Sequence, residues 1–347
     1  MCSSDLDKAR EQVADLIGAK SPGEIVFTSG GTESDNYSVK GVALHQKNSY
    51  GNHIITTSIE HSAVLHTCEH LEKHGFEVTY LPVDRHGLIS LDQLRETIRD
   101  DTILISIIYV NNEIGTIQSM AEICGIAQDH GVPVHTDAVQ AIGKIPVDVE
   151  DLGVNLLSLS AHKFYGPKGV GANYVRRRTR LANFVHGGAQ ERNRRAGTEN
   201  VAAIVGMGEA VEIAKRDLQE NSDRIVKLTN RLRNGLREKI ENIYENGHSE
   251  HKDPGTLSIS FESVSGEMLL MRLDMEGICA SSGSACASGS VEPSHVLAQL
   301  GIPPEVAQST VRFSMGSTNT EEQIDETIEK VTEIVAQIRS VQNSSWV

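Results

Sequence analysis

The hydrophobic and polar residues follow two alternating periods through the first half of the chain. Apolar residues three to four positions apart predict helices, and short runs that are apolar almost throughout predict buried strands. Helices are expected at 7–18, from 32, from 62, at 91–99 and at 120–130, and strands at 24–28, 53–57, 76–81, 102–110, 132–136, 155–160 and 169–175. Strands that are apolar on both faces are typical of a mostly parallel sheet covered by helices, so the pattern predicts an α/β fold.

The pattern changes in the second half of the chain. Residues 199–245 show a long helical pattern rich in Glu, Lys and Arg, and a Pro/Gly turn follows it. The later elements are expected to be a strand at 256–261, a helix at 266–275, a Gly/Ser-rich stretch at 279–290, a further helix, the strand TVRFS and a closing helix after the capping sequence TNTEEQID. We therefore expect a large domain over residues 1–220 and a smaller α+β domain over residues 221–347.

Composition and charge narrow the possible partners. The chain of 347 residues is 39% hydrophobic and 23% charged, which is an ordinary balance for a folded globular protein. Its 32 Lys+Arg and 47 Asp+Glu give a net charge of -15, which argues against sequence-independent binding to nucleic acid or to an anionic membrane. The single Trp and the seven Tyr offer no stacking platform for bases. Small molecules and basic proteins are the expected partners.

The sequence predicts neither a membrane span nor a secretion signal. Its longest apolar run, Ile103–Val110, includes Ser106 and is far shorter than the roughly 20 residues that a spanning helix needs. The N-terminus MCSSDLDKAR lacks the basic start and apolar centre of a signal peptide. The five cysteines are scattered and form no C-x-x-C pair, which excludes a zinc ribbon and disfavours a disulfide framework. We expect a cytoplasmic protein.

A Gly-rich turn joins the strand at 24–28 to the following helix. It contains Ser29, Gly30, Gly31 and Thr32. Glycines let the backbone approach an anion, and hydroxyls together with free amides at a helix N-terminus can hold a phosphate. The turn is neither a P-loop nor a GxGxxG motif, and on its own an ordinary turn is the favoured explanation.

Two further polar motifs follow predicted strands. Asp137, in HTDAVQ, could simply cap a helix, and Lys163, in SAHKFYGPKG, could simply be solvated. However, Lys163 is flanked by Ser160 and His162 at the carboxyl edge of the predicted sheet, where ligands of such sheets bind and where a lysine can form a Schiff base. Pyridoxal phosphate (PLP) requires an Asp for its ring nitrogen, a phosphate cradle and a Schiff-base Lys. The three motifs together therefore indicate PLP.

One cysteine stands out from the others. Cys286 lies at the centre of SSGSACASGS, whose small residues cannot surround a thiol as a hydrophobic core would. Cys279 is expected in a buried strand, and Cys68 and Cys124 lie within helical patterns and are expected in the core. Cys286 is the candidate reactive thiol.

Eight motifs together resemble one family. They are FTSGGTESDN, TSIEHSAV, NNEIGTIQ, HTDAVQAIGK, SAHKFYGPKGVG, GGAQERNRRAGTEN, SSGSACASGS and VRFSMG, and they span residues 25–316. Their types and order resemble the PLP-dependent cysteine desulfurases of the NifS/IscS group, within the class V aminotransferases. The long segment around Cys286 is similar to that of NifS and IscS rather than to the shorter one of SufS and the selenocysteine lyases. The resemblance implies a fold-type I enzyme, with PLP bound by residues 1–220 and a mobile cysteine loop at 279–290.

The resemblance also implies roles for individual residues. Lys163 would form the Schiff base, His61 would stack on the ring and assist proton transfer, and Cys286 would accept the sulfur. The implied cofactor-binding residues are Gly31, Thr32, Asn112, Asp137, Gln140, Ser160, His162, Lys163 and Thr198. Among these, Asp137 would pair with the ring nitrogen and Gln140 with the phenolate oxygen, and Thr32, Ser160 and His162 would hold the phosphate.

Two further implications concern substrate and assembly. Asn112 and Arg312 resemble the groups that bind the substrate carboxylate, for which an arginine offers a bidentate grip. Thr198 resembles the residue that reaches the phosphate from the other subunit, which implies a homodimer. No resident metal is implied, beyond transient contact of Cys286 with a cluster on a scaffold.

The implied reaction is the desulfuration of L-cysteine. Cys286, as thiolate, attacks the substrate sulfur, and the products are a Cys286 persulfide and L-alanine. The persulfide would pass to an acceptor protein for iron–sulfur cluster assembly or tRNA thiolation. The acidic surface fits a basic acceptor, although it fits a plainly solvated surface equally well.

The N-terminus departs from the family pattern. Family members carry an additional N-terminal segment with a strand resembling YLDNNATT, whereas this sequence opens almost directly on DKAREQVADLIGA. We therefore expect an N-terminally truncated chain, and hypothesise that residues 1–6 are an assembly artefact, because CSSDL is what the end of a common sequencing adapter would encode. Genomic sequence continuous with native upstream DNA would contradict this.

Three alternatives to the leading interpretation stay open. The first is a selenocysteine lyase or another class V PLP enzyme, which would tolerate replacement of Cys286. The second is an inactive, truncated remnant that binds no cofactor. The third is a zinc site formed by His66, His70 and His74, which would share one helix face, but no further ligand is indicated and a solvated face is favoured.

Overall fold

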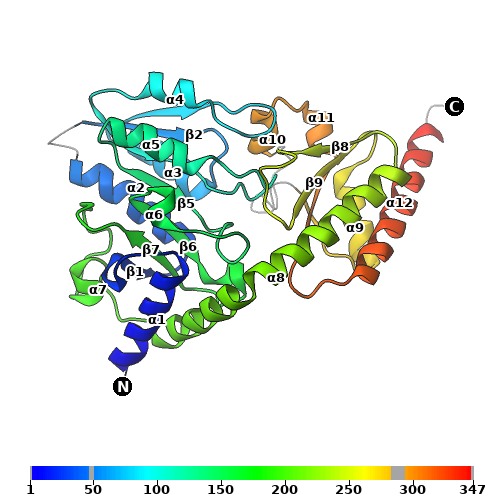
Figure 1. Ribbon diagram of the computed structural model, residues 1–347. Helices are drawn as coiled ribbons and strands as arrows, with labels where there is room; N and C mark the ends of the chain where they lie inside the picture. Colours follow the sequence, from blue (N-terminus) through cyan, green and yellow to red (C-terminus); the bar gives the residue numbers. More distant parts are fainter. Residues whose placement is uncertain (1, 47–50, 283–293, 345–347) are drawn as a thin grey trace. The chain divides into compact units, whose positions relative to one another are not determined.

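The computed structural model describes residues 2–46, 51–282 and 294–344 (Figure 1). The chain divides into two compact units. Met1–Pro82, Ile89–Asn111 and Gln118–Leu218 form the first unit, and Val83–Leu88, Asn112–Ile117 and Gln219–Val347 form the second. The segments 83–88 and 112–117 belong to the second unit, although the sequence pattern placed them within the large domain.

A seven-stranded sheet forms the centre of the first unit, in the order β1-β7-β6-β5-β4-β2-β3. Its strands are β1 (Ile25–Thr28), β2 (His53–Thr57), β3 (Glu77–Leu81), β4 (Thr102–Ser106), β5 (Val134–Asp137), β6 (Leu156–Ser160) and β7 (Gly171–Val175). Only β7 is antiparallel to its neighbours, β6 and β1, while the other pairs are parallel. The predicted α/β fold with a mostly parallel sheet is confirmed. Six strands therefore have their carboxyl ends at the same edge.

Helices connect and cover these strands. They are α1 (Cys2–Leu16), α2 (Gly31–Gln46), α3 (Ser62–Glu72), α4 (Leu91–Thr97), α5 (Met120–Asp129), α6 (Val149–Leu152), α7 (Gln190–Asn193) and the first part of α8 (Val201–Lys239), with short 3-10 helices at Pro22–Glu24 (η1) and Ala161–Phe164 (η2). One apolar cluster joins α2 and α3 to the sheet through fully buried side chains such as Val39, Val64, Ile54 and Leu104. Burial of this stripe against the sheet holds α2, and with it the Gly-rich turn, in place.

Two predicted elements differ from the structure. The strand expected at 102–110 ends at Ser106, although residues 107 and 108 remain buried. Beyond it the backbone still bonds the end of β5, because the amide of Tyr109 donates to the carbonyl of Asp137 over 2.9 Å. The helix expected to reach residue 245 ends at Lys239, and a strand, β8 (Ile243–Asn246), follows. This strand, IYEN, is only four residues long and follows the helix closely, which is why the pattern did not separate them.

The second unit is built on a four-stranded antiparallel sheet in the order β10-β11-β9-β8. Its other strands are β9 (Thr256–Phe261), β10 (Ser281–Ser282) and β11 (Thr310–Ser314), and its helices are α9 (Gly266–Met275), α10 (His295–Gln299), α11 (Pro304–Ala307), α12 (Glu321–Ser344) and the end of α8. Leucines of α8, such as Leu232, and isoleucines of α12, such as Ile328, pack with the strands in one core. Among the described helices, none combines the length and apolarity that crossing a membrane requires.

Candidate active site

The Gly-rich turn after β1 lies against the end of β6. A Cβ built on Gly31 would lie 2.8 Å from Cγ2 of Val139, and one on Gly30 would lie 3.6 Å from Oγ of Ser160. A Cβ on Gly171, in β7, would lie 2.7 Å from Cα of Gly30. The glycines thus permit a close approach of three backbone segments at the N-terminus of α2. Free amides at this position are suited to bind a phosphate.

Ser160 and His162 lie beside this turn. The hydroxyl of Ser160 is 2.9 Å from Nδ1 of His162. Burial, and the nearby charges of Lys163 and Lys168, lower the pKa of His162, so the ring is neutral at physiological pH. Thr32, in the first turn of α2, is exposed. Two of the three predicted phosphate ligands therefore form one hydrogen-bonded pair at the cradle.

Asp137 ends β5 at the same sheet edge. It is 5% exposed, and its Oδ1 accepts the amide of Val139 over 2.9 Å. Burial raises its pKa, while this hydrogen bond and the electrostatic interactions with His61 and Lys163 oppose that increase. A buried carboxylate with one bonded oxygen leaves the other oxygen for a protonated ring nitrogen.

His61 is held next to Asp137. It is the N-cap of α3, where its Nδ1 accepts the amide of Ala63 over 3.1 Å, so Nε2 carries the proton of the neutral ring. Ligating atoms of His61, Asp137 and Asp35 all lie within 4.8 Å of one another. His61 and Asp137 thus lie side by side in the first unit.

Lys163 and Gln140 complete the group in the first unit. Lys163 lies in η2, directly after β6, and is exposed. Gln140 accepts the Nζ of Lys144 on its Oε1 over 2.7 Å, which leaves its amide nitrogen to donate to an oxygen such as a phenolate. Thr198 lines a cavity of about 210 Å³ together with Ser29, next to the Gly-rich turn.

The two predicted substrate ligands lie in the second unit. Nη1 of Arg312, in β11, donates to the carbonyl of Asn112 over 2.7 Å. Its Nε is buried and has no hydrogen-bond partner among the described residues. A guanidinium with a free donor suits a carboxylate, because such a ligand would satisfy the unpaired nitrogen.

Two cysteines are buried as predicted, and a third is not. Cys68 and Cys124 are buried in α3 and α5 as expected, and burial raises the pKa of both, that of Cys124 to about 12. The expectation of a buried strand position for Cys279 is wrong: it is exposed and precedes β10. The Ala/Ser/Gly-rich sequence on its C-terminal side offers no large apolar residue to bury it. Cys286 lies outside the described residues.

The comparisons with known proteins identify the family. Residues 2–327 match the family Aminotransferase class-V. The chain is 52% identical over 336 residues to cysteine desulfurase IscS of Methanosarcina thermophila, covering 97% of this chain and 82% of that protein. It is 51% identical over 339 residues to cysteine desulfurase IscS of Escherichia coli O139:H28, covering 97% and 82%. The chain belongs to the cysteine desulfurase family of class V aminotransferases.

Solved structures agree with this assignment. A NifS-like protein superposes with a TM-score of 0.90 at 41% identity, covering 96% of this chain and 88% of that one. A structure described as SspA in complex with cysteine gives a TM-score of 0.81 at 39% identity, covering 92% and 88%. The family's fold is therefore that of this chain, and the NifS/IscS resemblance of the motifs is confirmed.

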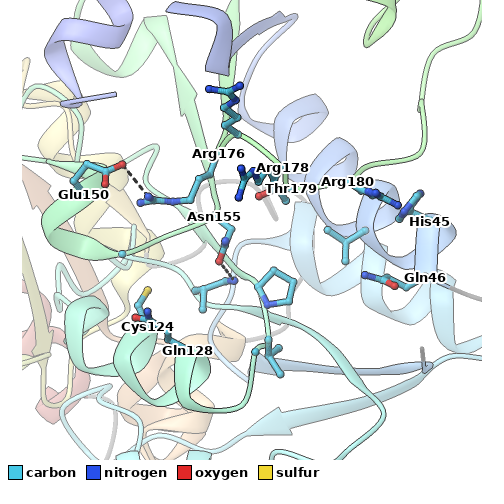
Figure 2. A pocket seen from close by; sticks show the side chains of 17 residues that line it. His45, Gln46, Cys124, Gln128, Glu150, Asn155, Arg176, Arg178, Thr179 and Arg180 are labelled. Carbon is cyan, nitrogen blue, oxygen red and sulfur yellow. Dashed lines mark hydrogen bonds and ion pairs between the residues drawn. The ribbon is translucent and has the colours of Figure 1, made fainter. Parts of the chain in front are cut away.

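One large cavity of this desulfurase lies away from the candidate site. It has a volume of about 710 Å³ and is lined by Pro133 and Asn155, which precede β5 and β6, so it lies at the opposite sheet edge. Figure 2 shows Arg176, Arg178 and Arg180 among the lining residues, with Arg176 paired to Glu150. None of the predicted cofactor or substrate residues lines it.

The histidine face on α3 gains no support as a metal site. His70 and His74 stack with ring centroids 4.2 Å apart, and Nδ1 of His74 bonds the carbonyl of His70. Within the described ranges, the one group of three ligating side chains close enough for a metal is Asp35, His61 and Asp137. That group belongs to the candidate active site.

Sequence analysis missed a buried polar network behind Asp137. Asp35, in α2, is fully buried, and the hydroxyl of Ser158 bonds it. Ser158 is also 3.0 Å from Nε2 of His135, whose Nδ1 is 2.8 Å from Ser106. Burial lowers the pKa of His135 to about 3, and burial and Asp137 raise that of Asp35. The His135 ring is therefore neutral at physiological pH, and burial together with Asp137 favours the protonated form of Asp35.

Glu60 is a second buried carboxyl that the sequence did not reveal. Its Oε1 accepts the hydroxyl of Thr57 over 2.6 Å and the amide of Ile108 over 2.9 Å. Burial raises its pKa to about 8. The signal available in the sequence was its position next to His61, just after the apolar strand HIITT.

Glu60→Gln is expected to flatten the pH dependence of stability. Because the folded pKa of Glu60 is raised to about 8, its contribution is fully present below about pH 4.5 and is lost as the pH rises through about 8. Glutamine accepts the same two hydrogen bonds without titrating. Between about pH 5 and about pH 8 the wild type should therefore lose a few kcal/mol more unfolding free energy than the variant. Urea unfolding at both pH values measures this, and equal losses would contradict it.

Proposed function

We propose that this chain is a PLP-dependent L-cysteine desulfurase that transfers the substrate sulfur to Cys286 and releases L-alanine. The observation that carries the proposal is the convergence of three motifs at one sheet edge in the first unit. The Gly-rich turn after β1, Asp137 at the end of β5 and Lys163 after β6 offer a phosphate cradle, a buried carboxylate and an amine. This set suits PLP and few other ligands.

The residues present fit the cofactor. The amides of α2, with Ser160 and His162, would hold the phosphate, Asp137 would face the ring nitrogen, and the amide of Gln140 would donate to the phenolate oxygen. When bound, the cofactor withdraws electrons from the α-carbon of an amino acid, which makes loss of the α-proton feasible.

The chain's own residues then supply the proton and sulfur transfers. The Nζ of Lys163 accepts the α-proton and returns a proton to the carbon fragment, and Nε2 of His61 assists. The Cys286 thiolate attacks the substrate sulfur, so that a sulfur–sulfur bond forms while the bond from Cβ to sulfur breaks and its electron pair stays on carbon. The carbon fragment takes up protons and leaves as L-alanine. The balance is L-cysteine plus thiol to L-alanine plus persulfide.

The assembly and the acceptor are part of the proposal. We infer a cytoplasmic homodimer in which Thr198 of one subunit reaches the phosphate of the other. The persulfide would pass to an acceptor protein of iron–sulfur cluster assembly or tRNA thiolation. The identity to proteins named cysteine desulfurase IscS supports this role.

The direct test is product formation. The purified chain, loaded with PLP and given L-cysteine and a dithiol, should release alanine and sulfide in equal amounts. Release of either product without the other would contradict the proposal.

Arg312→Lys is expected to raise the KM for L-cysteine by about tenfold to a hundredfold, because an ammonium cannot bind a carboxylate through two parallel hydrogen bonds. The turnover number should change much less, since the carboxylate does not react. Arg272→Lys is the matched control, because Arg272 lies in the same unit and its Nη1 donates to Gln337 on the surface. An unchanged KM in Arg312→Lys would place the substrate carboxylate elsewhere.

A further inference from the structure

Arg312 is connected to the chain segments on both sides of residues 283–293. On one side, β10 pairs with β11 so that Ser281 lies opposite Arg312 and Ser282 opposite Val311. On the other side, the chain is described again from Ser294, which caps α10 by accepting the amide of Leu297 over 3.3 Å. All these residues belong to the second unit.

Glu113 connects this second end to Arg312. The hydroxyl of Ser294 donates to Oε2 of Glu113, and both side chains are buried, at 6% and 4% exposure. Glu113 directly follows Asn112, whose carbonyl accepts Nη1 of Arg312. One short segment therefore carries two contacts, one to the guanidinium and one to the start of α10.

The charge on Glu113 depends on these same contacts. Burial raises its pKa to about 7, whereas the Ser294 hydroxyl and the charge of Arg312 lower it. A carboxylate in this position is costly unless hydrogen bonds and an opposite charge compensate it. Ser294 and Arg312, which both lower the pKa of Glu113, are also the two groups that Glu113 connects.

We propose that Glu113 is a positioning residue, which fixes the start of α10 relative to Arg312 through its hydrogen bond with Ser294. Ser282 and Ser294 flank residues 283–293. Ser282 is connected to Arg312 through the pairing of β10 with β11, and Ser294 is connected to it through Glu113. This rests on the proposed function, in which Arg312 binds L-cysteine and Cys286 takes its sulfur. Glu113 itself touches neither cofactor nor substrate in this assignment.

The test compares four variants of the PLP-loaded full chain. Glu113→Ala and Ser294→Ala should each lower the rate of Cys286 persulfide formation by about tenfold, the effect of losing a hydrogen bond to a charged group. The KM for L-cysteine and the cofactor spectrum should change by less than about twofold. Glu113→Gln keeps an acceptor and should retain most of the rate. Ser265→Ala is the matched control, because Ser265 caps α9 in the same unit without a carboxylate partner.

The double variant Glu113→Ala/Ser294→Ala separates positioning from general destabilisation. Residues that act through one contact give non-additive effects, so the double variant should lose no more rate than either single variant. A loss equal to the product of the single losses, or an equal loss in Ser265→Ala, would overturn the proposal. Urea unfolding of the same variants measures the coupling between Glu113 and Ser294 in free energy of unfolding, without any activity. A failure of the proposed function can therefore be distinguished from a failure of the positioning proposal. Should Glu113→Ala not fold, Ser294→Ala against Ser265→Ala still tests the contact.

Discussion

Replacing Lys163 by alanine is expected to reduce L-cysteine turnover by about 10²- to 10⁴-fold, the usual cost of losing a positioned acid–base group. The variant should also lose the visible absorption band that a lysine-bound cofactor gives. The physical reason is the position of the amine: Lys163 follows β6 in η2 and acts electrostatically on Asp137, the residue assigned to the ring nitrogen. The measurement is an absorption spectrum before and after L-cysteine, with alanine quantified in parallel.

Lys168→Ala is the matched control for this experiment. Lys168 is also exposed, lies five residues further along the same loop and has no assigned role in the reaction. It should keep the band and most of the turnover. If Lys163→Ala retained the lysine-bound band, another amine would hold the cofactor, and the assignment of the site would be wrong.

The sheet and its polar edge could be predicted because they depend on local patterns. Six of the seven strands of the first unit are buried at every position, and parallel strands bring their carboxyl ends together. It follows that Asp137 and Ser160, each at the end of a strand, lie at the same edge as the Gly-rich turn. No knowledge of distant packing was needed to place these residues together.

The buried carboxyls and the membership of segments 83–88 and 112–117 in the second unit could not be predicted in this way. Asp35 and Glu60 lie in polar stretches of sequence, and only the packing of α2 and of the β2–α3 connection removes them from water. Likewise, residues 112–117 belong to the second unit because Thr116 pairs with Lys252 and Asn112 with Arg312. Contacts between residues so far apart in sequence leave no signal in local periodicity.

Cys286→Ala is expected to reduce persulfide formation by about 10³-fold or more, as removal of a covalent nucleophile does. Cofactor binding should be preserved, because every residue assigned to the phosphate cradle and to the ring nitrogen lies in the first unit. The variant should therefore still change its absorption spectrum on addition of L-cysteine while forming no persulfide. Cysteine-resolved mass spectrometry after a single turnover measures the persulfide directly.

Cys279→Ala is the control that makes the result specific to Cys286. Cys279 lies seven positions earlier and is exposed, unlike the buried Cys68 and Cys124, so a sulfane sulfur could reach it from solvent. Its replacement should leave persulfide formation within about twofold of wild type, because surface substitutions away from a site have small effects. If Cys286→Ala stayed active and Cys279→Ala did not, the acceptor thiol would be Cys279. If both variants stayed active on selenocysteine alone, a lyase that needs no acceptor thiol would explain the site better, since only sulfur transfer requires a nucleophilic cysteine.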